Sequence, residues 1–169
     1  MVIAFYIAGI VAVIASIMVI TRLNAVHALL YLIVSLLAVA VAFYILGAPF
    51  AAALEVIIYA GAIMVFLLFV IMLLNLGPAS TNQEGQWLSA GMWIGPGLLA
   101  LVLVVEFIYI TGSSLSMTSE IPFTGAKIIQ AKQVGESLFS TYLLGVELAG
   151  MLLLAGLVGA FHIGRRVEK

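Results

Sequence analysis

The sequence predicts an all-α, polytopic integral membrane protein with five transmembrane helices. Of its 169 residues, 66% are hydrophobic and only 8% are charged, and the mean hydropathy is +1.35. A soluble domain of this length has too little interior to bury so much apolar surface. In lipid the backbone must satisfy its own hydrogen bonds, which leaves helices or a closed barrel. Long unbroken apolar runs, in place of short alternating segments, indicate helices.

Charge and cysteine content narrow the classes of function. The net charge of −1 and the lack of a basic cluster give no reason to expect a nucleic-acid partner. Because the chain has no cysteine, it has no residue for a disulfide, a thiolate metal site or iron–sulfur ligation. The first apolar run has no basic residues before it, so we expect a retained helix and not a signal peptide.

Runs of about 20 apolar residues predict the five spans, all in a single membrane domain of residues 1–169. The spans cover about residues 2–20, 25–46, 50–76, 92–110 and 138–163. Small residues recur every four positions in the first two spans, which predicts close helix packing; they are Ala4, Ala8, Ala12, Ser16, Ala38 and Ala42. Asn24 is placed to cap the second helix.

The connections are short, except for two polar loops. Residues 47–49 (Gly-Ala-Pro) predict a tight turn before the third span. Residues 77–90 form a polar loop, with Trp87 and Trp93 near its end as interfacial anchors. The outer loop, residues 111–137, is the longest polar segment, and its part at 126–134 is expected to form a short surface helix.

Basic residues set the expected orientation. More of them fall on one side of the predicted topology (Arg22, Arg165, Arg166 and Lys169) than on the other (Lys127 and Lys132). Positive charge favours the cytoplasmic side. We therefore expect the N-terminus outside and the C-terminus in the cytoplasm.

The third span carries residues that a simple membrane anchor does not need. Glu55 and Tyr59 are four residues apart and share a helix face, and Gly61 lies at the middle of the run. The glycine has two interpretations: tight helix packing, or a π-bulge that weakens the helix at a functional site. The length of about 26 residues, roughly 39 Å, leaves room for a tilt or a bulge.

Three carboxylates fall within predicted spans, where ionisable groups are functional candidates. The predicted span centres put Glu55 roughly 12 Å from the midplane and Glu147 about 5 Å from it. Glu147 is then the deepest acid, protonated or paired, and either a structural hydrogen bond or a proton relay explains it. Glu106 is expected near the outer end of its span, with its side chain reaching the headgroups, in a structural role.

Two long motifs resemble a known family. Residues 24–32 (NAVHALLYL) and 53–65 (ALEVIIYAGAIMV) resemble the J subunit, or chain 6, family of NADH-quinone oxidoreductase, respiratory complex I. Residues 146–149 (VELA), 152–156 (LLLAG) and 161–162 (FH) resemble its bacterial branch. The resemblance covers nearly the whole chain and is weakest across residues 112–132. Ala25 stands where the family usually has proline, and Glu106 is not part of the pattern.

The resemblance implies a non-redox subunit in the membrane arm, between the quinone-binding region and antiporter-like proton pumps. The implied neighbours are the K subunit above all, with A, H and N nearby, in the bacterial inner membrane. This chain would hold no cofactor, while the complex would use FMN, iron–sulfur clusters, NADH and a quinone. The family also implies a π-bulge in the third helix that switches a proton path, which by matching position assigns that role to Glu55, Tyr59, Gly61 and Val65.

The leading hypothesis is therefore a subunit that couples quinone reduction to proton translocation through a conformational switch in the third helix. Glu147 joins the candidate proton path because of its expected depth. One alternative is a purely structural assembly subunit. Another is the equivalent subunit of a related antiporter or membrane-bound hydrogenase complex. A freestanding transporter is disfavoured because the chain has no internal repeat.

Overall fold

The computed structural model describes residues 2–74, 90–114 and 128–165. These residues are helical almost throughout, and the described ranges contain no strand. Five helical stretches are long and apolar enough to cross a membrane, as predicted. The chain divides into two units, Met1–Ile129 and Gln130–Lys169, each of which is described separately below.

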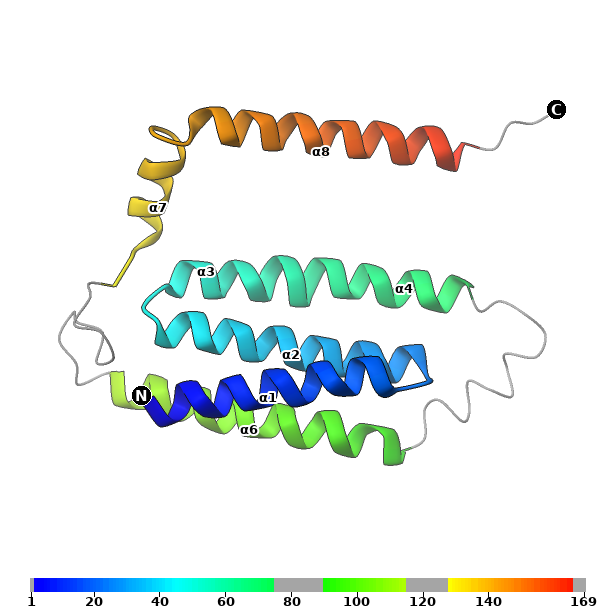
Figure 1. The fold of residues 1–169 in the computed structure, drawn as a ribbon, viewed down its shortest axis with the longest axis vertical. Helices are drawn as coiled ribbons and strands as arrows, with labels where there is room; N and C mark the ends of the chain where they lie inside the picture. The colour runs from blue at the N-terminus through cyan, green and yellow to red at the C-terminus, as the bar shows by residue number, and fades with distance from the viewer. Residues whose placement is uncertain (1, 75–89, 115–127, 166–169) are drawn as a thin grey trace. The chain divides into compact units, whose positions relative to one another are not determined.

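The first unit contains four of the five spans, which lie side by side (Figure 1). They are α1 (Val2–Thr21), α2 (Ala25–Ile45), a continuous third span made of α3 (Pro49–Leu54), η1 (Glu55–Ile63) and α4 (Met64–Leu74), and finally α6 (Ala90–Ser114). The α2 helix is central, because it contacts α1, α6 and all three segments of the third span.

The turn between α1 and α2 is fixed by a side-chain cap. Asn24 accepts hydrogen bonds through Oδ1 from the backbone N–H groups of Val26 (3.0 Å) and His27 (3.2 Å). These donors would otherwise lack partners at the start of the helix. The prediction that Asn24 caps the second span is therefore confirmed.

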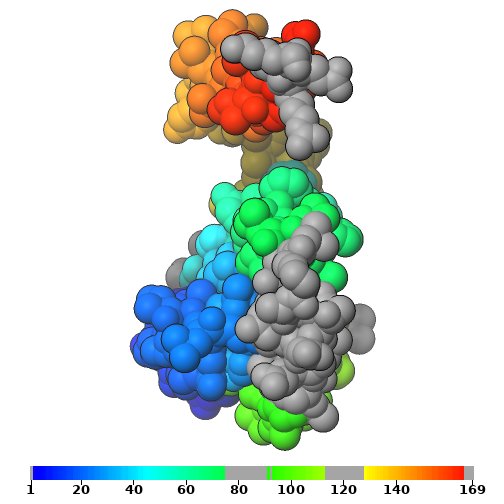
Figure 2. All heavy atoms as spheres, turned by 90° about the vertical axis from the view of Figure 1, so that its right-hand side faces the viewer, coloured from blue at the N-terminus to red at the C-terminus, as the bar shows by residue number. Residues whose placement is uncertain are grey.

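Small residues bring α1 and α2 into close contact (Figure 2). Ala8 on α1 and Ala38 on α2 are fully buried. Beside them the Ser16 and Ser35 hydroxyls lie 2.9 Å apart, and Ser35 also donates to the carbonyl of Ala12 at 3.2 Å. In hydrocarbon such packing and interhelical hydrogen bonds hold helices together, because lipid removes the hydrophobic driving force.

The turn into the third span depends on Gly47, whose φ of 83° lies in the left-handed region that favours glycine. Pro49 then begins α3 at a position where its missing N–H has no cost. The Gly47 carbonyl also accepts a 3.0 Å hydrogen bond from the N–H of Ile129, which ties the end of the first unit to this turn.

The α6 helix completes the core of the first unit. Leu103 and Ile110 are buried in the cluster that α1 and α2 form with it. Phe107 meets Tyr44 of α2 edge-on, with ring centroids 5.9 Å apart. The helix extends beyond the predicted 92–110 at both ends, because Ala90 and residues up to Ser114 continue the helical hydrogen bonding.

The second unit contains α7 (Ala131–Leu138) and α8 (Leu143–Gly164). The short helix expected at 126–134 therefore begins at Ala131, where Gln130 and Gln133 form a reciprocal capping box. The α8 span begins five residues later than the predicted 138, after a turn. Trp87 and residues 115–127 of the outer loop lie outside the described residues, whereas Trp93 is in α6.

A tight approach between α2 and α6 gives the first testable prediction. A Cβ atom at Gly95 would overlap the hydroxyl of buried Tyr31 and lie 3.1 Å from its Cζ. Overpacking of this kind costs about 1–3 kcal/mol. We expect Gly95→Ala to lower the thermal stability of the purified membrane protein, measured as loss of folded protein on heating.

Two variants serve as controls for that prediction. Gly97→Ala, two residues along the same helix, has open space around the added carbon and should leave stability unchanged or slightly raised. Tyr31→Phe combined with Gly95→Ala removes the clashing oxygen and should recover part of the loss. Equal effects of Gly95→Ala and Gly97→Ala would contradict this packing.

Candidate functional site

The third span changes its hydrogen-bonding pattern in the middle of the membrane. Its 26 residues from Pro49 to Leu74 run as one helix, but Glu55–Ile63 forms a nine-residue π-helical segment, η1. At its end the N–H of Met64 points at the carbonyl of Tyr59, five residues earlier, and also at that of Gly61. The bulge predicted for the third helix is therefore present, and it extends well beyond Tyr59–Gly61. Such segments are rare and concentrate at functional sites.

Gly61 lies near the end of η1. A Cβ atom there would lie 3.1 Å from the carbonyl oxygen of Val56, five residues upstream. This separation is shorter than an ordinary contact, so any side chain at position 61 would push on the backbone that closes the π turn. The one atom within 4 Å of that added carbon belongs to the helix's own backbone, so the described residues show no tight contact between Gly61 and another helix.

Four of the predicted site residues lie within 11 consecutive positions of this span. Glu55, Tyr59 and Gly61 belong to η1, and Val65 follows it in α4. Tyr59 is 50% exposed and Val65 is 47% exposed, whereas Glu55 and Gly61 are half-buried. The site therefore faces away from the core of the first unit, where another membrane protein or lipid can reach it.

The side chain of Met64 points toward the core of the first unit. Its side chain is only 5% exposed, although its neighbour Val65 is half exposed. Successive residues of a helix point about 100° apart. A change of one residue in helical register would therefore bring Val65 to the place that Met64 now holds. Sequence reasoning did not single out Met64, because in an almost uniformly apolar run no periodicity marks the inner face.

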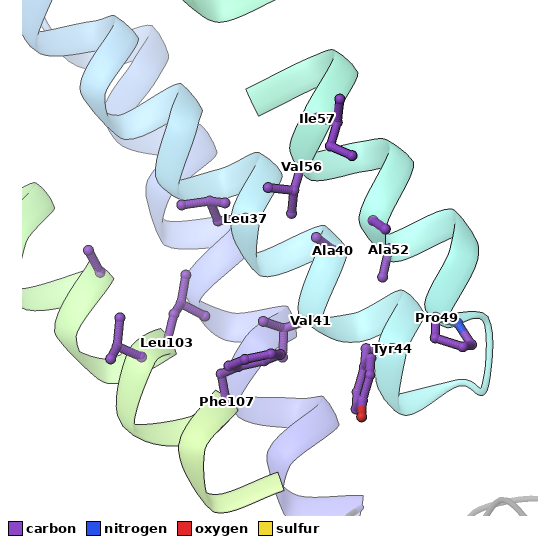
Figure 3. Close-up of a pocket in the computed structure, with 13 residues that line it drawn as sticks. Leu37, Ala40, Val41, Tyr44, Pro49, Ala52, Val56, Ile57, Leu103 and Phe107 are labelled. Atoms are coloured by element: carbon purple, nitrogen blue, oxygen red, sulfur yellow. The ribbon is translucent and has the colours of Figure 1, made fainter. Parts of the chain in front are cut away.

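An apolar groove of about 590 Å³ runs along the inner side of η1 (Figure 3). Val56 and Ile57 of η1 border it on one side, and Leu103 and Phe107 of α6 on the other, with Tyr44 of α2 nearby. Protein interiors are normally close-packed, so a space of this size means that η1 has few neighbours there. No sequence signal could have found the groove, because three separate helices form it.

The observed helix bounds correct the predicted depths of the three acids. Glu147 lies about 10 Å from the middle of α8, because this span begins at Leu143 and not at 138. Glu55 is also about 10 Å from the middle of its span. Glu106 is only about 5 Å from the middle of Trp93–Gly112 and is 7% exposed. The expectation that its side chain reaches the headgroups was wrong, because the side chain turns inward against the core.

Glu147 is in the second unit, so the structure does not bring it together with the residues of η1. Its neighbours along α8 are apolar on every side, and within its own unit no described group pairs with its carboxylate. The acid therefore stays a separate candidate.

Within the described ranges, no group of three or more His, Cys, Asp or Glu residues could hold a metal ion. Among the same residues no hydrogen bond joins Glu55 to Tyr59. The site therefore combines a π-helical segment with a half-buried carboxyl and an exposed phenol.

These features define a class of protein: a multi-pass, all-α membrane protein with a π-helical segment inside its third span. Residues 15–163 match the family described as NADH-ubiquinone/plastoquinone oxidoreductase chain 6. The chain belongs to this family.

Relatives resemble the chain over nearly its whole length. NADH-quinone oxidoreductase subunit J of Pseudomonas aeruginosa is 57% identical over 166 residues, which cover 98% of each chain. The subunit J of Escherichia coli K12 is 54% identical over 163 residues, 96% of this chain and 85% of that one. The subunit J of Buchnera aphidicola subsp. Schizaphis graminum is 48% identical over 161 residues, covering 95% of this chain and 96% of that one.

The contact at Gly61 gives a second prediction. Alanine is favoured over glycine in an α-helix by about 1 kcal/mol, and its Cβ disfavours the π form here. Gly61→Ala should therefore shift η1 toward α-helix and slow amide hydrogen exchange in peptides that cover residues 55–65 by about fivefold. The measurement is hydrogen exchange with mass spectrometry on the purified assembly. Gly97→Ala should leave these peptides unchanged, and unchanged exchange in Gly61→Ala itself would refute the prediction.

Proposed function

We propose that the chain is a membrane-arm subunit of a proton-pumping NADH:quinone oxidoreductase, and that η1 is a conformational switch that couples quinone reduction to proton translocation. Membership of the chain 6 family and the names of the relatives support the first part. The single observation that supports the second part is the nine-residue π-helical segment at Glu55–Ile63.

The switch rests on two helical forms of similar free energy. The π form keeps backbone groups paired at a spacing of five residues, and an α form would pair them at four, so both avoid unpaired groups in lipid. Conversion changes the register by one residue and turns α4 relative to α3. Val65 would then move between the outer surface and the place that Met64 holds.

Two features of the site lower the barrier to such a change. Gly61 removes the side chain that would meet the carbonyl of Val56. The groove beside Val56 and Ile57 gives η1 space in which to turn without first displacing packed side chains. In this proposal Val65 closes a hydrated path in one form and withdraws in the other, as hydrophobic constrictions gate channels by dewetting.

The acids have supporting roles in this proposal. Glu55 and Tyr59 offer a carboxyl and a phenol on the exposed side of η1, where they would contact water or a polar group of the K subunit. Glu147 would serve as a further proton-binding carboxyl from α8. Ionisable groups inside a membrane commonly mark proton pathways, which motivates both assignments.

The chain itself would carry no redox chemistry in this proposal. It lacks cysteine, so iron–sulfur ligation by thiolates has no residue here. FMN, the iron–sulfur clusters, NADH and the quinone would be bound by other subunits. The proposed neighbours are K, A, H and N, and the proposed orientation in the inner membrane places the N-terminus outside and the C-terminus in the cytoplasm.

The proposed function is tested by measuring proton pumping and the amount of assembled complex separately in each variant. We expect Gly61→Val or Tyr59→Ala to lower NADH-driven proton pumping in proteoliposomes much more than it lowers the amount of assembled complex. Valine places branched carbons against the Val56 carbonyl, and alanine removes the phenol. Gly97→Val, in the open space of α6, is the matched control. A parallel loss of assembly and pumping would mean that these residues only hold the bundle together.

The alternative of a purely structural subunit has its own test. Glu55→Gln and Glu147→Gln keep the shape of the side chain but remove the exchangeable proton. The proposal predicts that at least one of the two lowers proton transport per NADH oxidised. Full transport in both variants would favour a scaffold. If the chain instead co-purifies with antiporter or hydrogenase subunits, the proposed enzyme is wrong.

A further inference from the structure

Glu106 is a buried acid that the proposed switch does not use. Its side chain is 7% exposed, and both carboxyl oxygens are shielded from solvent. Neither oxygen has a hydrogen-bond partner among the described residues. A buried polar group without a partner is rare in proteins and calls for an explanation.

Among the described residues, the helices packed against α6 bring no basic side chain close to Glu106. The titratable side chains of α1 and of the neighbouring part of α2 are Tyr6 and Tyr44, and α6 itself adds Tyr109. Arg22 and His27 are basic, but they lie at the opposite ends of α1 and α2, about 25 Å along the helix axes. Glu55 on η1, the remaining acid of the described spans in this unit, borders neither Glu106's cavity nor the groove beside η1.

An ionised carboxylate in this position would therefore have neither a counter-charge nor a hydrogen bond, about 5 Å from the middle of the span. Burial of such a charge is strongly unfavourable, and the group takes up a proton instead.

A cavity lined mainly by apolar side chains lies beside this acid. A space of about 550 Å³ lies between α1 and α6, with Ile3, Ala4 and Ile7 on one side and Val102, Glu106 and Tyr109 on the other. Glu106 borders this space, and its two carboxyl oxygens are buried without a hydrogen-bond partner. A rotation about the side-chain torsions between staggered rotamers would bring the carboxyl into the cavity.

We propose that Glu106 is a proton-binding site of this chain. The carboxyl holds a proton while it is packed against the core. It exchanges that proton with water when the side chain rotates into the cavity between α1 and α6. The ligand is a proton with its carrier water, and no other reactant is needed. The site stands independently of the switch in η1, because it involves different helices.

Infrared spectroscopy of the purified complex in lipid tests the site directly. The wild type minus Glu106→Gln difference spectrum at pH 7.5 should contain the C=O stretch of a protonated carboxylic acid, because an ordinary Glu, with a pKa of about 4.3, is ionised at that pH. Glu55 and Glu147 are present in both samples and cancel. In D2O the band should shift to lower frequency as the proton exchanges.

The role of the cavity is tested by filling it. Ile7→Phe places a larger side chain in the space and should slow the shift in D2O several-fold. Ile10→Phe is the matched control, because Ile10 is on the same helix one turn further along, is exposed and does not border the cavity. If Glu106→Gln does not assemble, Glu106→Asp identifies the same band by moving its frequency.

Each outcome decides the proposal. A band that shifts in D2O, and shifts more slowly in Ile7→Phe alone, supports it. Absence of the band would show that Glu106 is ionised and paired, which overturns it. A band that does not shift would show a purely structural acid, and equal rates in Ile7→Phe and Ile10→Phe would overturn the cavity as the route. None of these results depends on the pumping assays of Gly61 and Tyr59 variants, so the two proposals fail separately.

Discussion

The backbone of the third span must satisfy its own hydrogen bonds, because the hydrocarbon around it offers none. Under this constraint, a π-helical segment such as η1 differs from a break in the helix. An unravelled loop at this depth would leave several N–H and C=O groups unpaired, whereas a π-helical segment keeps them paired at a different spacing. The span can therefore be irregular without being broken. A helix that has two ways of pairing its backbone can also move between them at low cost.

Local chemistry and packing both favour the irregularity at this position. Gly61 has no side chain that could press on the Val56 carbonyl. The groove beside Val56 and Ile57 leaves η1 loosely packed on that side. Elsewhere in the first unit the helices are held firmly. Fully buried Ala8 and Ala38 and the bond between Ser16 and Ser35 lock α1 to α2. In the proposed switch, this rigid pair would be the fixed surface against which the third span turns.

Much of this fold follows from the sequence, because apolar length and cap residues are local signals. Asn24 marks the start of α2 by its residue type alone, and Gly61 marks the weak point of the third span in the same way. The depth of an acidic residue within its span is harder to predict. Glu147 and Glu106 changed order in depth because α8 begins five residues late and because the fourth span extends to Gly112, and neither bound is visible in a uniformly apolar run. The inward side of Met64 and the groove depend on three helices and have no sequence signature.

The most direct test of the switch is a pair of structures of the assembled complex, at rest and during turnover, that resolve the backbone from Glu55 to Val65. The account predicts that in one state the N–H of Met64 bonds to the carbonyl of Tyr59, as it does here, and in the other to that of Ala60. The side chain of Val65 should turn by about 100° between the two. An unchanged π-helical segment with Val65 in one position in both states would contradict it.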